Sequence, residues 1–195
     1  MTDYLASTSW IDHHHPSIQS LVADRGWPRQ AEIEGAKAAY HFVRDEIAHS
    51  WDVQNPTVTR TASEVLEHRV GLCYAKSHLL AALLRAMGTP AGLAYQRLLL
   101  GDDPTDGFVA HGLTTVFLAG EWHRLDARGN RPGVDAQFSL TAPKLAFPVR
   151  PELGECDYPW NLATPHPQII GALTQATNIL EACLPESLTD PAAHL

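Results

Sequence analysis

The sequence predicts an α+β fold in which a leucine-rich helix packs on an antiparallel sheet, and three observations support this prediction. Residues 73–87 are dominated by leucine and alanine, and a glycine and a proline follow, as they do after many helices. Residues 109–118 and 121–127 are rich in β-branched and aromatic side chains and flank an Ala-Gly pair, which is typical of a hairpin. Residues 29–49 carry apolar side chains at helical spacing.

The first third of the chain is expected to contain an irregular arm and two helices. Residues 1–27 show no clear period, and Pro28 opens the helix over 29–49. Thr61 and Glu64 have the spacing of a capping box and predict a short helix ahead of Cys73. The expected core stripe of the longer helix consists of Ile33, Ala36, Tyr40, Val43 and Ile47.

The remaining elements complete the sheet and wrap the core. Residues 91–100 predict a strand behind the Cys73 helix, and residues 134–140 predict another. The segment 143–166 is proline-rich and irregular, which is typical of a lid, a cleft wall or a wrap around the core. Residues 167–184 predict a C-terminal helix.

Length and composition favour one soluble domain. A chain of 195 residues with 45% apolar composition supports a single domain over 1–195, with a core at about 29–140 and a C-terminal irregular segment and helix at 141–195. The net charge of −8, without a basic stripe, argues against a nucleic-acid partner. No stretch reaches the ~20 apolar residues of a membrane span, and the N-terminus does not resemble a secretory signal. An odd number of cysteines favours the cytoplasm, and the oligomeric state stays open.

Cys73 is the first candidate for a catalytic residue because it begins the leucine-rich helix. A thiol there faces the positive end of the helix dipole and unpaired backbone N–H groups, which favour the thiolate. Thiolate is the nucleophilic form of cysteine. The alternative for Cys73 alone is a buried structural thiol.

The predicted hairpin supplies a base and a group to orient it. If Leu118 pairs with Glu121, His111 and Asp126 lie on one face as diagonal neighbours, about 7–8 Å apart at the backbone. A register shift of one residue would move Asp126 to the other face. A histidine beside the cysteine can take its proton, and a carboxylate on the far ring nitrogen fixes the tautomer. We therefore predict a triad of Cys73, His111 and Asp126.

Two stretches of the chain resemble the core of the bacterial transglutaminase-like superfamily. They are TASEVLEHRVGLCYAKSHLLAALLRAMGTPAGLAY and AHGLTTVFLAGEWHRLDARGN, and the resemblance extends over about residues 35–130. It implies a papain-like fold, a Cys-His-Asp triad at the same three residues, and an upstream aromatic residue in the oxyanion site or cleft, for which Trp51 is the candidate. The matching positions are Gly71, Cys73, Arg85, Ala86, Gly88, Pro90, Ala91, His111 and Asp126.

The chain departs from the family pattern on both sides of the predicted site. Gly112 follows His111 where relatives often carry Trp, and Ala127 follows Asp126 where they often carry Pro or Thr. Both differences alter the wall of the site, so a relative's substrate does not carry over to this chain.

Other polar residues compete less well for a role. His78 lies about 140° around the helix from Cys73, and His123 is on the strand face opposite Asp126. Cys156 has acidic neighbours and Cys183 is expected to pack in the core. The histidines at 13–15 and the aspartates of the loop 101–107 lack the spacing of a metal site. No metal or cofactor is expected.

These features predict a thiol hydrolase of amide or peptide bonds that forms an acyl-enzyme thioester, with a peptide or protein as substrate. Two alternatives stay open. Capture of the same acyl group by an amine would give transamidation, and a non-catalytic binding or scaffold protein could keep the fold. Arylamine acyl transfer shares the chemistry, but no basic motif for a phosphorylated thioester cofactor is present.

Overall fold

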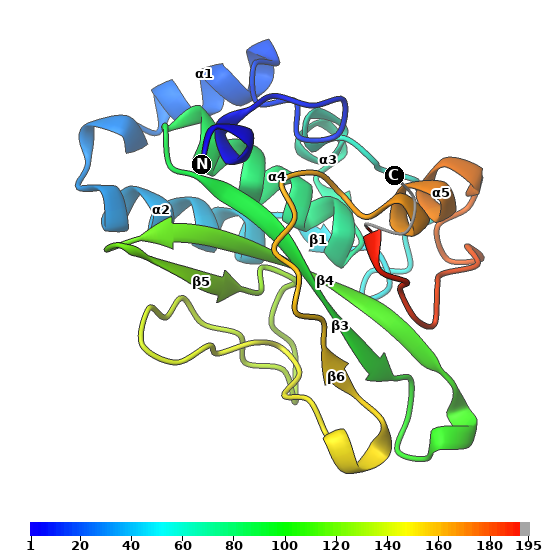
Figure 1. Ribbon diagram of the computed structural model, residues 1–195. Helices are drawn as coiled ribbons and strands as arrows, with labels where there is room; N and C mark the ends of the chain where they lie inside the picture. Colours follow the sequence, from blue (N-terminus) through cyan, green and yellow to red (C-terminus); the bar gives the residue numbers. More distant parts are fainter. Residues whose placement is uncertain (192–195) are drawn as a thin grey trace.

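The computed structural model describes residues 1–191 and places one helix between an antiparallel sheet and a group of further helices (Figure 1). Helix α4 (Cys73–Ala86) lies on a sheet with the order β5-β4-β3-β6. Every residue of α4 from Cys73 to Arg85 is buried, because the sheet covers one side and further helices cover the other. The predicted fold class is confirmed. The strands are β3 (Ala91–Leu99), β4 (Phe108–Leu118), β5 (Glu121–Leu125) and β6 (Cys156–Asp157), all antiparallel.

The β4–β5 hairpin has the register that the sequence predicts. Leu118 pairs with Glu121, and the ladder continues to Thr114 opposite Leu125. The turn residues Ala119 and Gly120 have φ of 53° and 86°, as in the type I′ turn that fits the twist of two antiparallel strands. The turn therefore fixes which side chains of β4 and β5 share a face.

Three helices form the layer on the far side of α4. They are α1 (Pro16–Asp24), α2 (Glu32–His41) and α3 (Ala62–His68). The predicted capping box starts α3, since the Thr61 hydroxyl accepts from Glu64 N and the Glu64 carboxylate accepts from Thr61 N, both at 3.1 Å. The expectation of an irregular 1–27 is wrong. Beyond η1 (Thr2–Leu5), α1 is capped by His15 Nδ1 and buries Ile18 and Val22.

The helix predicted over 29–49 is shorter at both ends. Pro28 lies in the 3-10 turn η2 (Trp27–Arg29), and α2 begins at Glu32, three residues after that turn ends. Ile33 therefore lies on the first turn of α2, where it is 39% exposed. After His41 the backbone widens into the π-helix η3 (Phe42–Glu46) and then becomes the strand β1 (Ala48–His49). The chain leaves the helix because β1 pairs with β2 (Val70–Gly71), a parallel strand that ends two residues before Cys73.

The C-terminal third contains less regular structure than predicted. Residues 134–140 form no strand, because the Asn130 side chain bonds both Ala136 N and Ala136 O and bends the segment into a loop. Helix α5 (Pro167–Gln175) ends nine residues early, since Arg60 binds the carbonyls of Leu173 and Ala176 at its C-terminus. Short 3-10 turns occupy Pro104–Asp106 (η4) and Pro151–Leu153 (η5).

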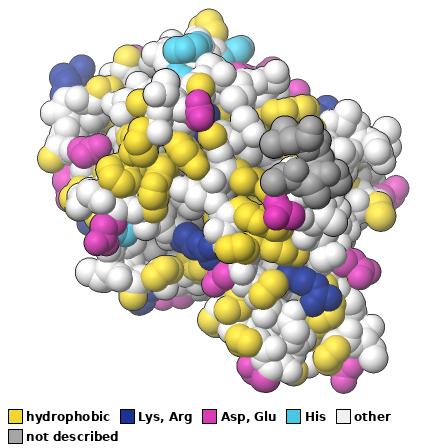
Figure 2. Space-filling model, in the orientation of Figure 1, with side chains coloured by type: hydrophobic (Ala, Val, Ile, Leu, Met, Phe, Trp, Pro, Cys, Tyr) yellow, Lys and Arg dark blue, Asp and Glu magenta, His cyan; other side chains and the backbone are white. Residues whose placement is uncertain are grey.

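Figure 2 shows Lys and Arg side chains scattered singly over one face of the molecule, between hydrophobic and acidic ones. No helix within residues 1–191 is long and apolar enough to cross a bilayer.

Candidate active site

Cys73 is the first residue of α4, as the sequence predicts, and the unpredicted strand β2 ends two residues before it. Its side chain is 8% exposed, and the preceding N-cap residue Leu72 provides no side-chain hydrogen bond to the helix end. The first backbone N–H groups of α4 are therefore not occupied by a cap, and the helix dipole points its positive end at the thiol. This local arrangement follows from the short β-strand that leads the chain into the helix.

Strand β4 crosses this helix end at very close range, and Gly112 makes the approach possible. A Cβ at Gly112 would lie 2.9 Å from Cδ1, 3.1 Å from Cα and 3.2 Å from N of Tyr74. The Gly112 N–H instead points at Cys73 Sγ, with N and S 3.4 Å apart, and the Tyr74 hydroxyl donates to Ala110 O. The departure from the family pattern at Gly112 thus brings β4 against the nucleophile helix.

His111 precedes Gly112, and the structure places it between Cys73 and Asp126. Its Nε2 lies 2.8 Å from Asp126 Oδ2, and the sulfur of Cys73 is near enough to help raise the pKa of His111. Because Nε2 is used by the carboxylate, Nδ1 is the ring nitrogen left for the thiol. The three predicted residues are therefore brought together, with His111 hydrogen-bonded to Asp126 and close to Cys73.

Asp126 has four polar partners, three on its carboxylate and one on its backbone carbonyl. Besides His111, Oδ2 accepts from Ala146 N at 2.9 Å, Oδ1 accepts from Arg128 N at 3.0 Å, and the Asp126 carbonyl accepts from the Tyr40 hydroxyl at 3.0 Å. Burial alone would raise the pKa of Asp126, but the charge of His111 and these hydrogen bonds hold it below its ordinary value. The carboxylate is thus fixed in both position and charge.

His111 has a raised pKa for the complementary reason. Burial alone would lower it, but the carboxylate of Asp126 and the sulfur of Cys73 outweigh burial and raise the pKa of His111 to about 10. The site therefore favours a protonated imidazole between two acidic groups.

A second layer of contacts covers the imidazole. The Phe147 ring meets the His111 ring edge-on at 5.5 Å, and the Arg128 guanidinium lies 5.7 Å from the Phe147 centroid. Arg128 in turn binds both carboxylate oxygens of Asp52, each at 2.8 Å. The irregular segment after residue 143 and the turn after β1 are thereby fastened over the site.

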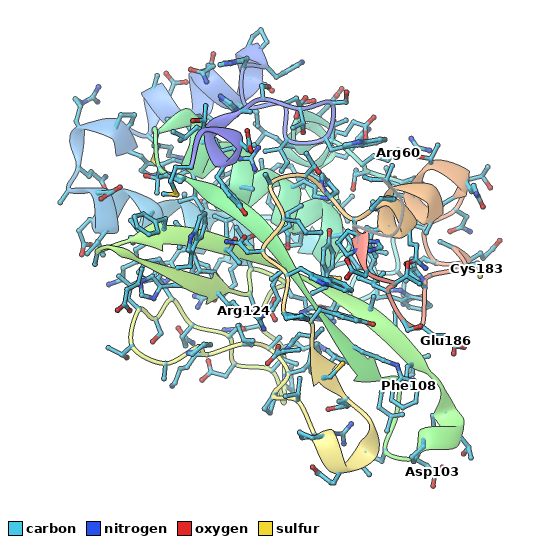
Figure 3. All side chains as sticks on the ribbon, viewed as in Figure 1. Arg60, Asp103, Phe108, Arg124, Cys183 and Glu186 are labelled. Carbon is cyan, nitrogen blue, oxygen red and sulfur yellow. The ribbon has the colours of Figure 1, made fainter. Side chains whose placement is uncertain are left out.

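The triad opens into a cavity of about 960 Å³. Trp51 lines it and is 46% exposed, so a large part of this residue faces solvent. Figure 3 shows Phe108 and Glu186, which line the cavity, toward the outer end of the β3–β4 hairpin. Most of the wall is apolar there. Its apolar residues are Leu98, Leu99, Leu100, Phe108, Val109, Ala110, Phe147, Pro148, Ala182 and Leu184.

The competing residues lie elsewhere or differ from expectation. His78 is fully buried and bonds Arg60 O through Nδ1, and His123 bonds Leu118 O. Cys156 and Cys183 are exposed, so the prediction that Cys183 packs in the core is wrong. Because α5 ends before it, Cys183 lies in an extended segment on the cavity wall (Figure 3).

Sequence reasoning did not assign roles to several residues that shape the site. His49 lines the cavity, Lys76 is wholly buried under it, and the pair of Arg128 and Asp52 closes one side. Lys76 Nζ donates to Ile47 O, which holds the end of the π-helix. These contacts join segments 29 to 76 residues apart, so no local spacing announces them.

The comparison with protein families agrees with this geometry. The model of the transglutaminase-like superfamily matches residues 20–127, more than half of the chain. The chain belongs to the transglutaminase-like superfamily. The matched range contains Cys73, His111 and Asp126.

Two solved structures are similar to part of this chain. A candidate cysteine protease from Cytophaga hutchinsonii shares 18% identity with a TM-score of 0.51, over 65% of this chain and 41% of that one. A structure described as a TGase shares 23% identity with a TM-score of 0.42, over 63% of this chain and 33% of that one. The chain thus spans less than half the length of either structure. No curated protein matches the chain.

Proposed function

We propose that this protein is a thiol hydrolase that cleaves amide bonds through an acyl-enzyme thioester. The observation that carries the proposal is the juxtaposition of Cys73 and His111 in the wall of a large cavity, with His111 hydrogen-bonded to the buried Asp126. Membership of the transglutaminase-like superfamily supports enzymatic activity of this type.

The reaction assigns one task to each residue. Cys73 Sγ forms a bond with the carbonyl carbon, and the π pair moves onto the carbonyl oxygen. As that pair returns, the C–N bond breaks and His111 gives its proton to the departing amine. Water then attacks the thioester with His111 as the base, which releases the acid and restores the thiolate–imidazolium pair. Asp126 keeps His111 oriented throughout and stabilises its protonated form each time that form appears.

The shape of the cavity favours a substrate with an apolar group on one side of the scissile amide. Leu98 pairs with Val109 and lies on the sheet face of His111, since positions two apart on β4 share a face. That face continues outward as the apolar wall of the cavity. We propose a peptide or protein segment as the substrate. Hydrolysis is favoured over transamidation because the cavity is open to water at Trp51.

The unpaired state of Cys73, Cys156 and Cys183 supports a reducing compartment such as the cytoplasm as the place of action.

The test is the pH dependence of iodoacetamide alkylation at each cysteine, followed by peptide mass spectrometry in wild type and His111→Ala. We expect Cys73 to react well below pH 7, whereas an ordinary thiol needs a pH near ~8.5. Cys156 and Cys183 are exposed and serve as internal controls. Since Cys73 is buried, a rate above theirs at pH 6 can only come from activation of its sulfur.

His111→Ala is expected to remove this reactivity at low pH and leave the two control cysteines unchanged. If Cys73 is inert in the wild type, or follows the same profile as the exposed cysteines, the hydrolase proposal is wrong. The chain would then be a binding or scaffold protein that keeps the fold.

A further inference from the structure

Two of the described residues that line the cavity are histidines, and the reaction proposed above uses only His111. The other is His49, the last residue of strand β1. It lies opposite Gly71 in the parallel ladder, and Gly71 is two residues before Cys73. Ser50 N donates to Gly71 O at 3.2 Å and fixes this register. The backbone of His49 is therefore tied to the same short strand that delivers the nucleophile.

The His49 imidazole is buried without a hydrogen bond. The residue is 8% exposed, and its Nδ1 has no partner within residues 1–191. The nearest carboxylate oxygen, Asp52 Oδ1, lies 3.9 Å from Nδ1, which is beyond hydrogen-bond length. Nε2 has no partner in the described chain either, but it is not sealed, so it is the nitrogen that the cavity reaches. A ring nitrogen in a cavity wall normally has a hydrogen-bond partner, so the accessible Nε2 is the atom for which a bound substrate can supply one.

The surroundings of His49 keep it neutral. Burial and the nearby Arg128 guanidinium lower the pKa of His49 to about 3, and Lys76 and His111 act in the same direction, while Asp52 opposes them. A neutral imidazole carries one N–H donor and is too weak a base to compete with His111 for the thiol proton. Its one N–H can still donate a hydrogen bond, which is the chemistry used below.

We propose that His49 is a catalytic residue whose Nε2–H donates to the carbonyl oxygen of the scissile amide. The inference rests on the proposed function. When Cys73 Sγ bonds to the carbonyl carbon, the electron pair displaced from the C=O bond settles on this oxygen, and the His49 N–H stabilises that charge without being transferred. His49 thus takes the role that the sequence suggested for Trp51. Trp51 is 46% exposed, whereas His49 is buried in the wall.

The test compares two reactions of the same sulfur. Acylation of Cys73 by p-nitrophenyl acetate, followed by the release of p-nitrophenolate, passes through an oxyanion. Alkylation by iodoacetamide occurs at a saturated carbon and creates none. We expect His49→Phe to slow acylation about 10²- to 10³-fold and to leave the rate and pH profile of alkylation unchanged. His49→Gln keeps an N–H donor and should recover part of the acylation rate.

His68→Phe is the matched control, because His68 is exposed at the end of α3 and outside the cavity. It should leave both reactions unchanged. If His49→Phe and His49→Gln both acylate at the wild-type rate, the inference is overturned. A parallel loss of acylation and alkylation also overturns it, since His49 would then only support the pair of Cys73 and His111. A wild type in which Cys73 performs neither reaction refutes the proposed function itself.

Discussion

Substitution of Gly112 by alanine should separate the nucleophile from its base without touching either. The added Cβ would meet Tyr74 Cδ1 at 2.9 Å and the Tyr74 backbone at 3.1 and 3.2 Å. Contacts of ordinary length begin at 3.4 Å, so the strand and the helix must move apart by a few tenths of an ångström. The Tyr74 ring cannot swing away, because it is buried and its hydroxyl donates to Ala110 O.

The expected magnitude has a structural part and a catalytic part. Overpacking of this kind costs about 1–3 kcal/mol of unfolding free energy. Because the Gly112 N–H contacts Cys73 Sγ and its neighbour is His111, the same movement stretches the contact between thiol and imidazole. Misplacement of reacting groups on this scale can cost up to about 100-fold in rate. We expect alkylation of Cys73 at pH 6 to fall by about ten-fold or more, within that bound.

The assay pairs urea unfolding with the alkylation profile, and Gly171→Ala is the matched control. Gly171 lies in α5 with no atom within 4 Å of an added Cβ, so alanine there should stabilise the protein by about 0.5–1 kcal/mol. Its effect on Cys73 should be nil. A Gly112→Ala protein with wild-type stability and wild-type alkylation would refute the claim that this glycine sets the distance between β4 and α4.

Two further predictions concern stability. Burial, followed by the charge of Arg128, lowers the pKa of Lys76 from 10.5 to about 7, so between these values the unfolded chain binds a proton that the folded protein lacks. The stability of the wild type relative to Lys76→Met should therefore rise with pH across this window, by at most about 1.4 kcal/mol per pH unit in urea titrations. A difference that does not change with pH would show that Lys76 stays charged in the fold. Leu83 is fully buried in α4, so Leu83→Ala should lower the free energy of unfolding by about 2–5 kcal/mol. Val53 is 54% exposed, so Val53→Ala should change it by no more than about 0.5 kcal/mol. Equal losses of stability at both positions would contradict the burial pattern.

The parts of the site that the sequence predicts are those fixed by local chemistry. A two-residue turn with positive φ at both positions sets the hairpin register, and the register sets the shared face of His111 and Asp126. The capping box and the leucine pattern likewise locate α3 and the start of α4 from nearby residues alone. Periodicity is thus sufficient where an element is regular and its end is marked by a turn or cap.

The unpredicted parts depend on partners distant in sequence. Helical periodicity continues from α2 past His41, yet the chain leaves the helix and pairs with β2. Lys76 donates a hydrogen bond to the carbonyl of Ile47, which lies where the chain leaves the helix. The end of α5 depends on Arg60, more than a hundred residues earlier. His49 reads as the end of a helix in the sequence, and only the pairing of β1 with β2 places it in the cavity wall.

The two histidines of the cavity show how the same type of side chain takes different charge states within one site. His111 and His49 are almost equally buried, at 5% and 8% exposed, so burial lowers the pKa of both. The difference lies in the nearest carboxylate. Asp126 binds His111 directly, whereas the charge of Asp52 is already matched by Arg128 through two hydrogen bonds. Arg128 therefore leaves His49 neutral, whereas Asp126 keeps His111 protonated, which is the division between hydrogen-bond donor and proton donor that the proposed acyl transfer requires.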